Sequence, residues 1–193
     1  LARLSGADRE RLAQTLRTAR GILEGSGGEG AGPARIRMRA PRPGDLGWII
    51  ERNASVYAEE FGWDETYEAL VARIVADFAG GRDPSREAAW VAELDGRRAG
   101  CVMCMSDSAP DTARLRLLLV DPGARGHRLG DRLVQECVDF ARGAGYRAIV
   151  LWTNDVLTAA RHIYQRAGFE LIKEEQHHSF GHDLVGQDWR LAL

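Results

Sequence analysis

The spacing of apolar residues divides the chain into three parts. Between Leu12 and Leu23, apolar residues recur at helical intervals, which predicts an amphipathic helix within residues 1–24. Residues 25–34 contain five glycines and no run of large apolar residues, so we expect a flexible linker there. From residue 35 to residue 193, apolar runs alternate with polar turns, as they do in a folded domain.

Within residues 35–193 the apolar periodicity changes repeatedly between the strand pattern and the helix pattern. We expect strands at 36–39, 88–94, 99–105, 113–120, 146–153 and 188–193, and helices at 45–60, 65–78 and 156–165, with one more helix starting at about 129. We also expect Asp45 to cap the first helix of this domain and Asp95-Gly96 to form a hairpin turn. This order predicts an α+β domain in which helices flank a mixed, mostly antiparallel central sheet, with the N-terminal helix detached from it.

Composition narrows the class of protein. The 193 residues are 45% hydrophobic and 28% charged with a net charge of −2, which is ordinary for a globular domain. We therefore expect neither nucleic acid nor an anionic membrane as a partner of this domain. No apolar stretch reaches the roughly 18 residues of a membrane span, and the first residues lack the apolar core of a signal peptide, so we expect a cytoplasmic protein. Because the chain begins without Met, we expect it to be a piece of a longer protein.

The three cysteines do not indicate a metal site. Cys101 and Cys104 stand three residues apart in one expected strand and would point to opposite faces of the sheet. With no second pair at metal-ligand spacing, we expect reduced, mostly buried thiols and no bound metal.

The turn after the expected strand at 113–120 is the most informative stretch. The strand stops at Asp121-Pro122, a basic and glycine-rich turn follows, and a helix opens at about Leu129. Unpaired N–H groups and the helix dipole at such a helix start favour a phosphate or pyrophosphate, and Arg125 and Arg128 add positive charge. By itself the turn is unspecific, because its glycines could serve only to connect a strand and a helix.

Downstream of this turn come a second apolar strand, a helix that carries Tyr164 near its end, and Gly168-Phe169. This order of elements resembles the acetyl-CoA-binding core of the Gcn5-related N-acetyltransferases, the GNAT superfamily. The resemblance covers roughly residues 35–193. It implies the GNAT fold and an acetyl-CoA-dependent transfer of an acetyl group to a primary amine by direct attack.

The family's pyrophosphate-binding pattern, Arg/Gln-x-x-Gly-x-Gly/Ala, falls on Arg125–Gly130. Its first and last positions match, whereas Arg128 replaces the middle glycine. We expect Arg128 to keep a negative φ, which the start of a helix allows. The resemblance implies that acetyl-CoA is held by the following residues: Leu118, Leu119, Val120, Arg125, Gly126, His127, Arg128, Leu129, Gly130, Asp131 and Asn154.

The resemblance also implies roles in the chemistry. Tyr164 would protonate the departing CoA thiolate, and backbone groups of Leu118 and Val120 would hold the thioester carbonyl and the pantetheine arm. A splay between the strands that end at Val120 and Thr153 would admit this arm. Asn154 lies at the mouth of the splay, where it would either hold pantetheine amides or cap the following helix.

The acceptor side is less well defined by the sequence. The candidate acceptor-binding residues are Glu60, Phe61, Trp63 and His178. The aromatic residues around Trp63 would form a helix–helix core, an acceptor cage, or both. No general base is assigned, because Arg114 stands near the strand position where some family members carry Glu. The alternatives for the base are Glu59, Glu60, Asp64, His177, His178 and His182.

The first residues resemble the final helix of a MarR-type winged-helix regulator, and later segments resemble the acetyltransferase half of regulator–acetyltransferase fusions. We therefore expect residues 1–24 to end an upstream domain, residues 25–34 to be a linker, and residues 35–193 to be the N-acetyltransferase domain. The alternative function is an acyl-CoA-binding sensor that regulates a fused or partner DNA-binding domain. The sequence does not decide whether the acceptor is a small molecule or a protein amine. It also leaves open whether the protein forms a homodimer.

Overall fold

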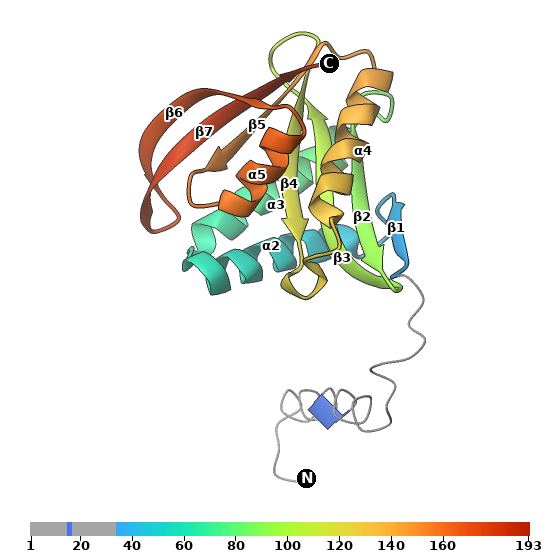
Figure 1. Ribbon diagram of the computed structural model, residues 1–193, viewed down its shortest axis with the longest axis vertical. Coiled ribbons are helices and arrows are strands. Elements are labelled where there is room, and N and C mark those ends of the chain that lie inside the picture. The colour runs from blue at the N-terminus through green and yellow to red at the C-terminus, as the bar shows by residue number, and fades with distance from the viewer. Residues whose placement is uncertain (1–14, 17–33) are drawn as a thin grey trace. The chain divides into compact units, whose positions relative to one another are not determined.

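The computed structural model describes residues 15–16 and 34–193 (Figure 1). The helix expected at 1–24, with its MarR-like segment, and the linker expected at 25–34 lie almost wholly outside the described residues. Arg35–Leu193 form one compact unit that contains the sheet and its helices.

The elements of this unit follow one another as strands and helices that match most of the expected segments. They are β1 (Ile36–Arg39), α2 (Asp45–Phe61), α3 (Glu65–Gly81), β2 (Ala88–Leu94), β3 (Arg97–Ser106), β4 (Thr112–Val120), the short 3-10 turn η1 (Pro122–Ala124), α4 (Leu129–Gly143), β5 (Ala148–Asn154), α5 (Thr158–Arg166), β6 (Glu170–Ser179) and β7 (His182–Ala192).

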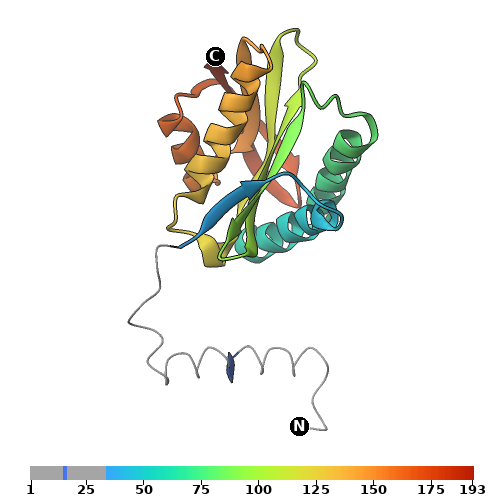
Figure 2. The same cartoon turned by 90° about the vertical axis from the view of Figure 1, so that its right-hand side faces the viewer.

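The strands form one seven-stranded sheet in the order β1-β2-β3-β4-β5-β7-β6. Within it β4 and β5 run parallel, and every other neighbouring pair is antiparallel. Helices α2 and α3 cover one face, and α4 and α5 cover the other (Figure 2). The expected α+β class with a mixed, mostly antiparallel sheet is confirmed.

Each face of the sheet has its own hydrophobic core. On one face, α4 buries a stripe of residues at helical spacing, namely Leu129, Leu133, Val134, Cys137, Val138 and Ala141. On the other face, Ile49 of α2 packs with Val71 and Val75 of α3. Cys101 belongs to this second core and Cys104 to the first, so the expected free, buried thiols on opposite faces are confirmed.

The start of α2 differs from the expectation. Gly44, with φ 92°, is the N-cap, and no side chain caps the helix. Asp45 is instead the first helical residue, and its buried carboxylate accepts hydrogen bonds from the Arg39 guanidinium and the Arg42 N–H. These bonds, Arg39 first, hold the pKa of Asp45 below its usual range and tie β1 to α2.

The C-terminal part also differs from the expectation. A single strand was expected at 188–193, but the chain forms the long hairpin β6–β7. β6 lies at the edge of the sheet and is exposed along nearly its whole length, so no alternating apolar pattern marks it in the sequence. His177 and His178 therefore lie on a strand, and His182 begins the next one.

Candidate active site

The parallel strands β4 and β5 separate after a few residues. They pair over residues 112–114 and 148–150 only, although both strands continue well beyond. Near the point of separation β4 contains a bulge, where Leu117 has φ 52° and the register with β3 shifts. The splay expected between these strands is present.

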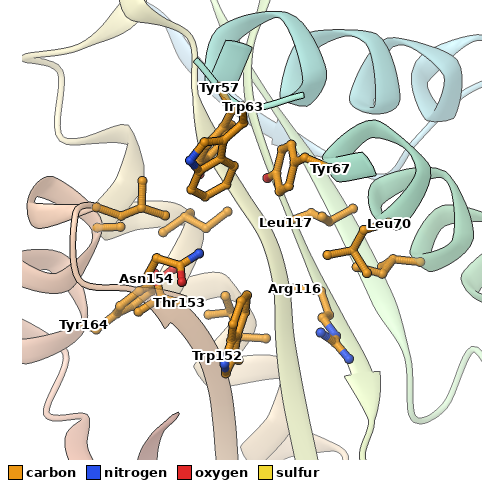
Figure 3. A pocket seen from close by; sticks show the side chains of 15 residues that line it. Tyr57, Trp63, Tyr67, Leu70, Arg116, Leu117, Trp152, Thr153, Asn154 and Tyr164 are labelled. Atoms are coloured by element: carbon orange, nitrogen blue, oxygen red, sulfur yellow. The ribbon is translucent and has the colours of Figure 1, made fainter. Parts of the chain in front are cut away.

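A central cavity of about 80 Å³ lies at this splay (Figure 3). Its walls come from five elements, with Tyr57 on α2, Tyr67 on α3, Leu118 on β4, Asn154 on β5 and Tyr164 on α5. The cavity is thus built from segments that are far apart in the sequence.

Two further depressions adjoin the central cavity. A loop-side cavity, which reaches Arg125, shares Leu118 with the central cavity. A hairpin-side groove, which reaches the turn between β6 and β7, shares Leu70 and Trp152 with it. The three form one row that leads from the loop before α4, past the splay, to the β6–β7 hairpin.

The loop before α4 presents a row of unused hydrogen-bond donors. α4 begins at Leu129, and the Arg132 N–H makes its first bond, to the Arg128 carbonyl. In the part of the chain that the structure describes, no acceptor is bonded to the N–H groups from Gly126 to Asp131. Together with the helix dipole, these donors suit a phosphate or pyrophosphate.

The expectation that Arg128 keeps a negative φ is wrong. Its φ is 56°, in the left-handed region, and Gly126 nearby has φ 87°. This backbone conformation costs a residue with a side chain about 1–2 kcal/mol, whereas glycine adopts it freely. The loop therefore keeps the backbone shape of a glycine at a position where the chain has arginine.

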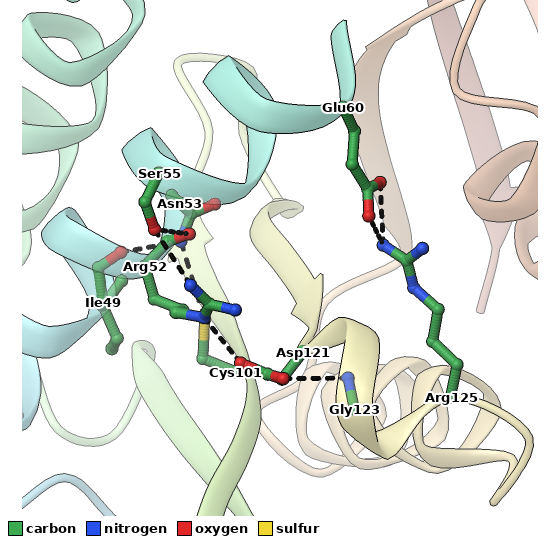
Figure 4. Close-up of polar contacts among 9 residues, drawn as sticks. All are labelled: Ile49, Arg52, Asn53, Ser55, Glu60, Cys101, Asp121, Gly123 and Arg125. Atoms are coloured by element: carbon green, nitrogen blue, oxygen red, sulfur yellow. Dashed lines mark hydrogen bonds and ion pairs between the residues drawn. The ribbon is translucent and has the colours of Figure 1, made fainter. Parts of the chain in front are cut away.

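Ion pairs tie this loop to α2 (Figure 4). Arg52 binds Asp121 just after β4, and Glu60, near the end of α2, binds Arg125 at 2.7 Å. Asp121 also accepts a hydrogen bond from the Gly123 N–H. The guanidinium of Arg125 is therefore already paired with a carboxylate.

The first turn of α4, just after the loop, is tied to α5. The Asp131 carboxylate pairs with Arg166 of α5 at 2.7 Å and with Arg128 at 3.5 Å. A Cβ on Gly130 would lie 2.5 Å from the Ile163 side chain, so this glycine permits the close approach of the two helices. The Arg128 side chain is 80% exposed and remains the most accessible cation of the loop.

Tyr164 has the environment of a proton donor. It is buried, with 5% of its surface exposed, and it lines the central cavity. Among the described residues its hydroxyl has no hydrogen-bond partner. Burial raises the pKa of Tyr164, so the hydroxyl stays protonated at neutral pH and can donate to a group in the cavity.

Asn154 is held by a hydrogen-bond chain from β6. Its Oδ1 lies 2.8 Å from Nε2 of His177, whose Nδ1 lies 2.9 Å from the Ser179 hydroxyl. Asn154 does not cap α5, because that helix has Leu157 as its N-cap and no side-chain cap. The Asn154 amide nitrogen has no partner within the described part of the chain, and the residue lines the cavity with these donors unused (Figure 3).

The aromatic residues between α2 and α3 form both a core and a cavity wall. Trp63 lies with its ring centroid 4.9 Å from that of Tyr57 and 4.8 Å from those of Tyr67 and Phe180. Tyr57, Trp63 and Tyr67 also line one end of the central cavity (Figure 3). These residues therefore form the helix–helix core and also line the cavity, whereas their role as an acceptor cage stays a prediction.

The four candidate acceptor-binding residues lie in three different places. Trp63 lines the central cavity, and Glu60 and Phe61 line the loop-side cavity. His178 lines the hairpin-side groove, where its Nδ1 lies 2.7 Å from an Asp183 carboxylate oxygen. The structure does not bring these four together as one binding site.

The candidate general bases lie outside the lining of the central cavity. Among the described residues, no Asp, Glu or His side chain lines this cavity. Asp64 caps α3, His177 holds Asn154, and His182 contacts the Gly62 carbonyl at 3.1 Å. The site therefore offers a proton donor but no evident proton acceptor.

Of the two arginines on the middle of β4, only one reaches the cavity. Arg114, which the sequence singled out, pairs with Asp107 and is not among the lining residues. Arg116 lines the cavity instead, and sequence reasoning missed it. Arg116 stands two residues after Arg114 and therefore lies on the same face of the strand. This spacing is the sequence signal that could have identified it.

Metal chemistry finds no support in the described residues. No group of three or more His, Cys, Asp or Glu side chains there lies close enough to hold an ion. In the same part of the chain, no helix has both the length and the hydropathy that a membrane span needs.

Comparison with known proteins identifies the family. The model of the acetyltransferase (GNAT) family matches residues 50–169. "Probable N-acetyltransferase camello" of Xenopus tropicalis is 38% identical over 87 residues, which cover 45% of this chain and 40% of that protein. N-acetylaspartate synthetase of Danio rerio is 33% identical over 93 residues, which cover 48% of this chain and 33% of that protein. The matches thus span less than half of these two relatives.

A solved structure shows the same fold. The structure of yncA from Salmonella typhimurium, determined with its cofactor acetyl-CoA, superposes with a TM-score of 0.65 at 19% identity. The superposition covers 81% of this chain and 93% of that one. On the match of the family model and on this fold, the chain belongs to the acetyltransferase (GNAT) family.

Proposed function

We propose that residues 35–193 form an N-acetyltransferase domain that moves an acetyl group from acetyl-CoA to a primary amine. The splay between β4 and β5 carries this proposal, because it joins the row of free N–H groups at 126–131 to the central cavity. A long donor molecule can bind its pyrophosphate at the loop and extend its thioester into the cavity. The acetyl-CoA bound to yncA supports this choice of donor.

The residues that would hold the donor follow from this arrangement. The N–H groups from Gly126 to Asp131 and the exposed Arg128 would bind the pyrophosphate. Backbone groups of Leu118 and Val120, at the splay, would hold the thioester carbonyl and the pantetheine arm. The unused amide donors of Asn154 would bind a carbonyl of that arm.

The proposed reaction needs little covalent help from the protein. The amine nitrogen attacks the thioester carbonyl carbon while the cavity holds the two in contact, and the carbon–sulfur bond then breaks. Tyr164 donates its proton to the departing thiolate and later regains one from solvent. The attacking nitrogen loses its proton to water, since no carboxylate or imidazole among the described residues lines the cavity.

Titration calorimetry with acetyl-CoA and with CoA tests the donor assignment. We expect saturable binding of both ligands, because they share the pyrophosphate and the pantetheine arm. Absence of binding at millimolar ligand would overturn the proposal.

A sensor that binds acyl-CoA without turnover is the second candidate. It is favoured because no Asp, Glu or His side chain of the described residues lines the central cavity. Under this alternative, acetyl-CoA binds in the titration, yet a broad panel of primary amines releases no CoA.

We further propose that this domain is the C-terminal half of a cytoplasmic regulator in which residues 1–24 end a MarR-type domain. The support is the resemblance of the first residues to such a helix, which lies outside the described residues. DNA binding by the full-length protein, with and without acetyl-CoA, tests this arrangement; a full-length chain without a winged-helix domain would contradict it.

A further inference from the structure

Arg116 is a charged side chain at the central cavity that forms no ion pair within the described part of the chain. It is half-buried on β4, and it lies with Trp152 at the end of the cavity opposite the aromatic residues Tyr57 and Trp63 (Figure 3). No carboxylate forms an ion pair or a hydrogen bond with it within residues 34–193. Its neighbour on the same strand, Arg114, has such a partner in Asp107.

Keeping the half-buried guanidinium of Arg116 without an ion-pair partner costs free energy. A partly buried cation loses hydration, and the loss is normally compensated by a nearby anion. Burial, and then the positive charge of Arg114, lower the pKa of Arg116, whereas the charge of Asp107, which pairs with Arg114, acts in the opposite direction and does not outweigh them. Leu70, Ile74 and Leu117, which line the same cavity, provide no hydrogen-bond acceptor on their side chains. An anionic ligand in the cavity would supply the missing compensation.

A second arginine lies on the route to this cavity. Arg73 of α3 lines the hairpin-side groove and is exposed, again without a carboxylate partner among the described residues. The groove shares Trp152 with the central cavity, so an anion that enters there passes Arg73 before it reaches Arg116. Asp64 also lines the groove, but its carboxylate is bonded to the N–H and hydroxyl of Thr66.

We propose that the acceptor is a primary amine that also carries a carboxylate, as a free amino acid does, and that Arg116 binds this carboxylate. The proposal rests on the acetyltransferase function proposed above and names the class of its substrate. A guanidinium can bind a carboxylate through two parallel hydrogen bonds, which orients the amine as well as binding it. Arg73 contributes attraction at the entrance. Polyamines, which carry only positive charge, fit this cavity poorly.

Matched amines test the proposal. CoA release is measured with phenylalanine, phenylalaninamide and phenethylamine, and with alanine and alaninamide. Because a hydrogen bond to a charged group contributes about 1.5–3 kcal/mol, we expect each carboxylate-bearing amine to have a kcat/KM at least about tenfold above its neutral counterpart. Arg116→Gln should abolish this preference, and Arg116→Lys should keep part of it. Arg114→Gln, on the same strand but outside the cavity, is the matched control and should leave the preference intact.

Equal kcat/KM values for the acids and their neutral counterparts would overturn the proposal while leaving the acetyltransferase function in place. If no amine is acetylated, binding of the reaction product tests the carboxylate site independently of turnover. N-acetylphenylalanine and its amide are titrated into the CoA-bound protein, with tryptophan fluorescence as the readout. Tighter binding of the acid, lost in Arg116→Gln, supports the carboxylate site even without turnover. Equal binding of acid and amide contradicts it, whereas acetyl-CoA binding without any turnover contradicts only the proposed function.

Discussion

At the scale of single residues, Tyr164 combines two properties that a proton donor to a thiolate needs. It lines the central cavity, and its hydroxyl is unbonded among the described residues. Tyr164→Phe removes the hydroxyl and little else. We expect kcat to fall by about 100-fold with acetyl-CoA affinity unchanged, as measured by steady-state kinetics and calorimetry.

The control for this variant is Tyr146→Phe. The Tyr146 hydroxyl bonds Ser106 and the Arg86 carbonyl and does not line the cavity, so its loss should lower stability without changing kcat. An unaffected kcat in Tyr164→Phe would remove Tyr164 from the mechanism.

Arg128 gives a second prediction at this scale. Because its φ is 56°, Arg128→Gly should relieve backbone strain and raise the free energy of unfolding by about 0.5–1 kcal/mol, measured by urea denaturation. His127→Gly is the neighbouring control, and because His127 does not have a positive φ, this change should destabilise the protein. A loss of stability in Arg128→Gly would show that the left-handed conformation carries no strain.

At the scale of elements, the sequence predicted most of the sheet but missed an edge strand. The segments from β1 to α5 were expected within a few residues, because each has an apolar face that repeats with period 2 or 3.6. β6 has no such face, since it lies exposed at the edge. Its register with β7 brings His177 to Asn154, a contact that no local pattern reveals.

The bulge in β4 explains why the sequence located the loop better than the cavity. The glycines of the loop are visible in the sequence, whereas Leu117 takes a positive φ without a glycine to indicate it. Alternation counted through this residue assigns the following side chains to the wrong face. Arg116 precedes Leu117 and shares a face with Arg114, so alternation predicts its side of the sheet. That it lines a cavity does not follow from the sequence, because the other walls come from distant segments.

The contact between β5 and β7 gives a prediction for the hairpin. A Cβ on Gly186 would lie 2.8 Å from Nε1 of Trp152, so Gly186→Ala must displace the indole that lines the cavity. We expect a shift in tryptophan emission and a loss of about 1–2 kcal/mol in stability. Gly143→Ala, at the open end of α4, is the control and should leave the emission unchanged and cause no loss of stability. An unchanged emission spectrum in Gly186→Ala would contradict this packing.

At the scale of the whole molecule, buried neutral groups set the stability at high pH. Burial raises the pKa of Tyr57 and of Cys101 to about 12, and it raises those of Tyr67 and Tyr164 as well. These values exceed those of the unfolded chain, so the folded state binds more protons at high pH. The resulting stability is fully present below about pH 9 and is lost as the pH rises towards 12.

Urea denaturation at constant ionic strength from pH 8 to 11 measures this effect. Above about pH 10 the free energy of unfolding should fall by more than about 1 kcal/mol per pH unit. A flat profile over this range would show that the fold does not raise the pKa values of the three tyrosines and Cys101.

Acetyl transfer at the splay between β4 and β5 is the central proposal for this molecule. The most direct test mixes the protein with acetyl-CoA and a library of primary amines and follows the release of the free CoA thiol, with the acetylated product identified by mass spectrometry. We predict stoichiometric CoA and N-acetyl product with at least one amine that carries a carboxylate. Saturable acetyl-CoA binding with no thiol release from any amine in the library would contradict the account.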